Sequence, residues 1–126
     1  MSAAKEGVAG TMRKLSKRII KIDPSYSDGG GYFMLGAVHF KSPYIPFVLS
    51  WPSNAKAVEY LTLAYSTGKS TPSQTVYLSQ ALHKNGQVKK AISLLSSLLD
   101  ENISKTYKLE DMDQHEIARG LLEEWQ

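Results

Sequence analysis

Apolar residues in this chain recur at a helical spacing, and one such pattern returns thirty-four residues further along. The first copy of the pattern consists of Ala57, Val58, Leu61 and Ala64, and the second consists of Ala91, Ile92, Leu95 and Leu98. Self-similarity at a fixed period of this length is the sequence signature of repeat architectures. The chain of 126 residues is therefore expected to be built from stacked helix pairs.

Helical periodicity and helix-ending residues predict six helices. They are expected over residues 5–22, 32–42, 53–66, 71–85, 88–100 and 111–125. Asp23-Pro24 ends the first helix, because proline cannot continue a helix. Thr71 is expected to be the N-cap of the fourth helix, and Asn85-Gly86 to end it in a left-handed turn. No stretch reads as a strand, so the predicted fold class is all-α.

The first helix is predicted to be amphipathic. Its apolar front is a single stripe made of Val8, Met12, Leu15, Ile19 and Ile22. Its back carries the basic residues Arg13, Lys14, Lys17, Arg18 and Lys21, which are expected to be a solvated face. In the last helix, the inward positions are expected to be Ile117, Leu121, Leu122 and Trp125.

The repeat spacing predicts a single helical-repeat domain over 1–126. Its parts are an orphan second helix of a preceding repeat (5–24), a repeat (30–67), a second repeat (71–101) and a terminal capping helix (111–126). An insertion, 43–52, interrupts the first repeat. It contains three prolines among aromatic and aliphatic side chains, so it is expected to pack on the body or to line a cavity.

The repeat resembles that of the tetratricopeptide superfamily over about residues 12–100. Ala57-x3-Leu61 and Ala91-x3-Leu95 match the A-x3-F half of the family pattern, and Leu35-Gly36 with Tyr32 matches its L-G step. The resemblance implies two paired repeats plus flanking helices. Small residues at Gly36, Ala57 and Ala91 are expected to let paired helices approach closely.

A narrower likeness rests on Gly30-Gly31-Tyr32, Leu35-Gly36-Ala37, Lys41-Ser42-Pro43 and the insertion from Pro46 to Ala57-x3-Leu61. In these segments the chain is similar to the T-component proteins associated with TRAP-type periplasmic transporters. That resemblance implies a trimer that binds a hydrophobic or amphipathic solute. The sequence has neither a lipobox cysteine nor a secretion-signal layout. A periplasmic lipoprotein is therefore expected only if the N-terminus is truncated, and a cytoplasmic protein otherwise.

Composition and charge exclude several classes of protein. The chain has no cysteine, which excludes a disulfide framework, a zinc finger and a thiol nucleophile. It has no apolar run long enough for a transmembrane helix. Residues 1–22 hold six Lys or Arg against one Glu, and residues 100–126 hold eight Asp or Glu against three Lys or Arg. This pattern is not the sustained basic stripe of a nucleic-acid binder, and it leaves head-to-tail association open.

Motifs that carry catalysis or metal binding are missing from the sequence. His39, His83 and His115 are not spaced with a second ligand as in a helical metal motif, and Gly-x-Ser-x-Gly is absent. Gly29-Gly30-Gly31 is not followed by the GK[ST] of a phosphate loop. We therefore expect no catalytic residue, no metal, no cofactor and no enzymatic activity.

Binding is the function that remains. In a helical repeat the first helix of each pair lines the concave face, and the L-G register places eight candidate ligand-binding residues on or near that face. They are Phe33, Ala37, Phe40, Tyr44, Trp51, Val76, Gln80 and His83. Two alternatives stay open: binding of a hydrophobic small molecule, and a scaffold that recognises a protein partner or forms a homo-oligomer. For each aromatic residue, core packing is the competing interpretation.

Overall fold

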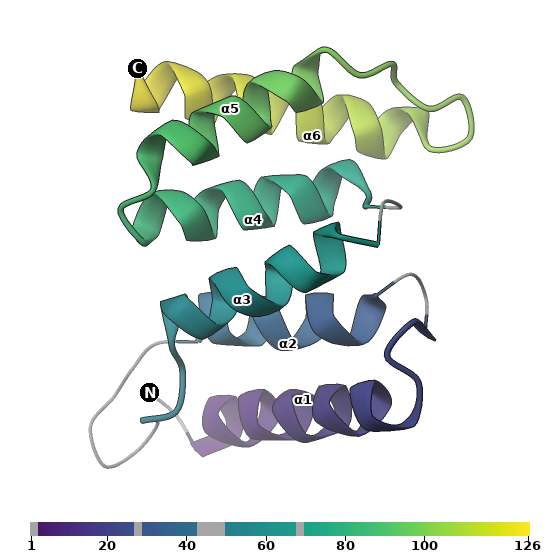
Figure 1. The fold of residues 1–126 in the computed structure, drawn as a ribbon, viewed down its shortest axis with the longest axis vertical. Helices are drawn as coiled ribbons and strands as arrows, with labels where there is room; N and C mark the ends of the chain where they lie inside the picture. Colours follow the sequence, from purple (N-terminus) through teal and green to yellow (C-terminus); the bar gives the residue numbers. More distant parts are fainter. Residues whose placement is uncertain (1–2, 27–28, 43–49, 68–69) are drawn as a thin grey trace. The chain divides into compact units, whose positions relative to one another are not determined.

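The computed structural model describes residues 3–26, 29–42, 50–67 and 70–126, and every regular element in these ranges is a helix. The helices are α1 (Ala3–Ile22), α2 (Gly30–Lys41), α3 (Asn54–Tyr65), α4 (Pro72–Lys84), α5 (Val88–Leu99) and α6 (Lys108–Trp125) (Figure 1). No strand occurs in the described ranges, and the predicted all-α class is confirmed. Most of the 43–52 insertion, from 43 to 49, lies outside the described residues.

The contacts divide the chain into two compact units, residues 1–69 and 70–126. In the first unit, α2 packs against both α1 and α3 (Figure 1). In the second unit, α5 packs against α4 and α6, and α4 also contacts α6. The predicted helix pairs correspond to α2 with α3 and to α4 with α5. This packing is compatible with a helical repeat, and the tetratricopeptide assignment stays a prediction.

Close approach of α2 and α3 depends on a residue without a side chain. A Cβ atom added at Gly36 would lie 2.6 Å from Cγ of Leu61 and 3.0 Å from the backbone nitrogen of Leu61. Ala57 and Ala64 on α3 are completely buried. The expected close approach at Gly36 and Ala57 is therefore confirmed.

The core of the second unit lies among its three helices. Val76, Leu95, Leu98 and Ala118 are buried there, and Leu99, Leu121, Leu122 and Trp125 pack against them. The predicted caps of α4 are present: Thr71 and Gln74 form a reciprocal capping box, and Gly86 has a φ of +85°.

The start and inner face of α6 differ from the prediction. The helix begins at Lys108 rather than near Asp111, because the hydroxyl oxygen of Ser104 accepts hydrogen bonds from the Thr106 and Tyr107 backbone N–H groups and orders the turn before it. Ile117, which was expected to face inward, is exposed. The buried residues Asp111, His115 and Ala118 follow a helical spacing that leaves Ile117 outside.

The inward face of α1 is also different from the prediction. Val8, Met12, Leu15 and Ile22, which we call the α1 stripe, are exposed, and the small residues Ala9 and Ser16 are buried instead. A Cβ added at Gly31 of α2 would lie 3.0 Å from side-chain carbons of both Ile19 and Ile20. The absence of a side chain at Gly31 admits Ile19 and Ile20, so Ile19 of the predicted stripe faces α2 while its other four residues are exposed.

Candidate functional site

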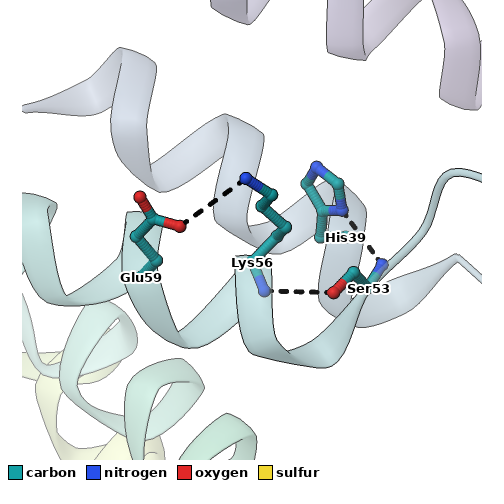
Figure 2. A network of polar contacts seen from close by, with 4 residues as sticks. All are labelled: His39, Ser53, Lys56 and Glu59. Atoms are coloured by element: carbon teal, nitrogen blue, oxygen red, sulfur yellow. Dashed lines mark hydrogen bonds and ion pairs between the residues drawn. The ribbon is translucent and has the colours of Figure 1, made fainter.

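The polar centre of the first unit is His39, a buried residue near the end of α2. Its Nδ1 accepts a hydrogen bond from the backbone N–H of Ser53, at 3.1 Å (Figure 2). Ser53 is the N-cap of α3, and its hydroxyl oxygen accepts from the backbone N–H of Lys56 at 3.2 Å. His39 thus ties the end of α2 to the start of α3.

His39 is held in its neutral form. Its pKa is lowered from 6.5 to about 4, mainly because burial disfavours the charged imidazolium. The positive charges of Arg13, Lys17 and Lys56 act in the same direction. Because Nδ1 accepts a hydrogen bond, the ring proton is on Nε2. These properties suit a structural hydrogen-bond acceptor better than a residue that exchanges protons near neutral pH.

Trp51 lies at the centre of an aromatic and cationic cluster, the Trp51 cluster, which consists of Arg13, His39, Trp51 and Tyr60. The indole meets the His39 ring edge-on, with centroids 5.2 Å apart and planes at 87°. The Arg13 guanidinium carbon lies 4.7 Å from the indole centroid, and the rings of His39 and Tyr60 are 5.8 Å apart. The cluster joins α1, α2 and α3, so Trp51 contributes to the packing of the first unit.

Arg13 was expected on a solvated face, and this expectation is wrong. The side chain is half-buried because the flat guanidinium stacks on Trp51, a favourable cation–π arrangement. Its Nε is buried and has no hydrogen-bond partner. The sequence signal that could have revealed this contact is weak, because thirty-eight positions separate Arg13 from Trp51.

The predicted ligand-binding residues belong to two groups. Phe33, Ala37 and Phe40 of α2 are half-buried, as is Trp51. Tyr44 lies outside the described residues. These positions are all in the first unit.

The other predicted residues are in the second unit, on α4. Val76 is not available to a ligand, because it is buried in the core with Leu95 and Leu98. Gln80 is half-buried. The ring of His83 stacks on that of Trp125, with centroids 4.2 Å apart and planes at 9°. Core packing thus accounts for Val76, and intramolecular stacking for one face of His83.

Two exposed surfaces were not assigned as sites from the sequence. One is the α1 stripe. The other is the α6 face, which consists of Leu109, Met112, Asp113, Glu116 and Glu123, all exposed. At the first turns of α6, Ile103, Leu109 and Met112 border a hollow of about 460 Å³ whose lining also includes Asp113, Glu116 and Arg119.

Metal-binding clusters and membrane-spanning helices are two features that the described ranges lack. No three His, Cys, Asp or Glu side chains gather closely enough there to hold a metal ion. Of the helices described, none combines the length and apolar character needed to cross a membrane. Comparison with models of known families gives no match, and comparison with curated proteins gives none either.

Proposed function

We propose that this protein is a non-enzymatic helical scaffold that binds another protein chain through the exposed apolar side of α1. The observation that supports this function is the α1 stripe, whose four large apolar side chains lie in the solvent. Contiguous apolar surface of this kind is typical of interaction sites. An exposed apolar helix face is also the form that helix-in-groove recognition requires.

A folding role does not account for the stripe. In the contact of α1 with α2, Ile19 and Ile20 approach Gly31, whereas Val8, Leu15 and Ile22 keep half or more of their surface exposed. Replacing the exposed side chains is therefore expected to leave the first unit folded. The stripe is free to serve binding.

Binding of a hydrophobic or amphipathic solute is the second proposal. It depends on the half-buried aromatic side chains Phe33, Phe40 and Trp51. A protein partner is favoured because Trp51 already contacts Arg13 and His39, whereas Val8, Leu15 and Ile22 have no such partners among the described residues.

A photocrosslinking side chain on α1 tests the scaffold function. Benzoylphenylalanine in place of Leu15 should crosslink to protein in cells that express the chain. The same group in place of Glu59, an exposed position on α3, is the matched control and should crosslink much less. Equal crosslinking at both positions, or none at Leu15, would contradict the proposed function.

A further inference from the structure

The α1 stripe is exposed along its length, least at Met12, whose exposed fraction is 37%. The exposed fraction is 61% for Val8, 50% for Leu15 and 74% for Ile22. These residues are spaced at intervals of seven, so they lie nearly in line along the helix. A partner must therefore present an elongated apolar surface.

Positive charge runs beside the stripe. Lys14, Arg18 and Lys21 follow a spacing of four and three, and Arg18 lies three residues after Leu15 and four before Ile22. All three are exposed, and none takes part in an ion pair within the described residues. We call these three residues the basic row. Acidic groups on a partner would neutralise it.

The α6 face has the complementary character. Leu109 is 79% exposed and Met112 is 45% exposed, next to the hollow described above. Asp113, Glu116 and Glu123 are exposed on the same face and outnumber Arg119, which also lines the hollow, so the net charge there is negative. The α6 face thus combines apolar with acidic side chains, whereas the apolar α1 stripe lies beside the basic row.

From these two surfaces we propose that the α1 stripe of one copy of this chain binds the α6 face of a second copy. This inference rests on the proposed function and names its partner. A contact between two α1 stripes would bring two basic rows together, and a contact between two α6 faces would bring acidic groups together. Like charges at close range disfavour both symmetric arrangements.

The proposed contact joins two different surfaces of the chain, the α1 stripe in the first unit and the α6 face in the second. After one such contact has formed, the pair of copies still has one unoccupied α1 stripe and one unoccupied α6 face. Such heterologous association gives a ring if the rotation closes and an open chain of copies if it does not. The mass in solution should therefore rise with concentration.

Charge reversal tests the pairing. The first variant is Lys14→Glu/Arg18→Glu/Lys21→Glu, and the second is Asp113→Lys/Glu116→Lys/Glu123→Lys. Each variant alone carries a net charge of the same sign on both surfaces and should sediment as a monomer at concentrations where the unchanged chain associates. An equimolar mixture of the two should associate again, because each surface then meets its opposite.

Two measurements accompany the sedimentation runs. Far-UV circular dichroism should show that both variants are as helical as the unchanged chain. Raising NaCl from about 50 mM to about 500 mM should weaken self-association about tenfold, because several exposed charge pairs are screened together.

Four results would overturn the proposed pairing of the α1 stripe with the α6 face. The first is an unchanged chain that stays monomeric at all concentrations, and the second is a first variant that associates as the unchanged chain does. The third is an equimolar mixture of the two variants that stays monomeric. The fourth is an effect of charge reversal that does not depend on protein concentration, because such an effect would act within one chain. A monomeric chain that still crosslinks to another protein through Leu15 would refute this inference and leave the scaffold function standing. A monomeric chain without such crosslinks would refute both.

Discussion

Gly36→Ala tests the close contact between α2 and α3. In most helix interiors this substitution stabilises the folded state by about 1 kcal/mol, because glycine is a poor helix former. Here the new methyl carbon would lie 2.6 Å from Cγ of Leu61, where carbon atoms normally keep about 3.5–4.0 Å. The backbone nitrogen of Leu61, at 3.0 Å, prevents relief by rotation of the leucine alone.

The expected loss follows from these distances. Forcing an extra methyl into a packed interior typically costs about 1–3 kcal/mol, and the gain in helix propensity returns about 1 kcal/mol. Leu61 is buried and its backbone is fixed in α3, so we place the cost toward the upper end. The net free energy of unfolding should fall by about 1–2 kcal/mol.

Urea unfolding followed by fluorescence measures this effect. The chain has two tryptophans, Trp51 in the first unit and Trp125 in the second. A Trp125→Phe background therefore reports on the first unit alone. Gly120→Ala on α6, in a Trp51→Phe background, is the matched control, since no atom lies within 4 Å of the added methyl. The control should gain about 0.5–1 kcal/mol.

The two alanine substitutions should thus change stability in opposite directions. If Gly36→Ala stabilises its unit as Gly120→Ala does, the helices are not in the close contact described. The reasoning about Gly36 would then be wrong.

Three further predictions concern single side chains. The pKa of His39 is about 4 in the folded state and about 6.5 in the unfolded state, so the folded state binds fewer protons at the pH values between them. The free energy of unfolding should therefore be highest above pH 6.5 and should fall by up to about 3 kcal/mol as the pH drops to 4. Unfolding curves across this range should lose that slope in His39→Gln, and an unchanged slope would refute the assignment. Arg13→Gln should cost the first unit about 0.5–1 kcal/mol and alter Trp51 emission; emission that does not respond would show that the guanidinium is not on the indole. Thr71→Ala should lower the free energy of unfolding of the second unit by about 1 kcal/mol, as measured by Trp125 emission, whereas Thr71→Ser should keep most of the capping interaction. Equal losses in the two variants would argue against the capping box.

Local sequence rules predicted the helices well. The end of α1 at Ile22 follows from Asp23-Pro24, and the start of α4 follows from Thr71-Pro72. These boundaries depend on neighbouring residues only, so a single sequence contains the needed information. The sequence predicts the start of α6 near Asp111, later than its actual start at Lys108, because the hydrogen bonds of the turn around Ser104 cannot be inferred from composition.

Which face of a helix is buried was harder to predict. Periodicity identified the apolar stripe on α1, but the direction it faces depends on the surface of α2, where Gly31 admits a close neighbour. The contact of Arg13 with Trp51 likewise depends on tertiary packing between distant segments. For the same reason, the sequence could not show that the predicted ligand-binding residues differ in burial. Those on α2 are half-buried, whereas Val76 lies in the core of the second unit.

Disulfide trapping between single-cysteine variants tests most directly what covers the α1 stripe. The chain has no cysteine, so Leu15→Cys and Met112→Cys each carry one thiol. When the two variants are mixed under mild oxidation, the account predicts that the mixed disulfide between α1 of one copy and α6 of another forms well in excess of either symmetric dimer. A predominance of Leu15→Cys homodimers, or a statistical mixture of all three products, would contradict it.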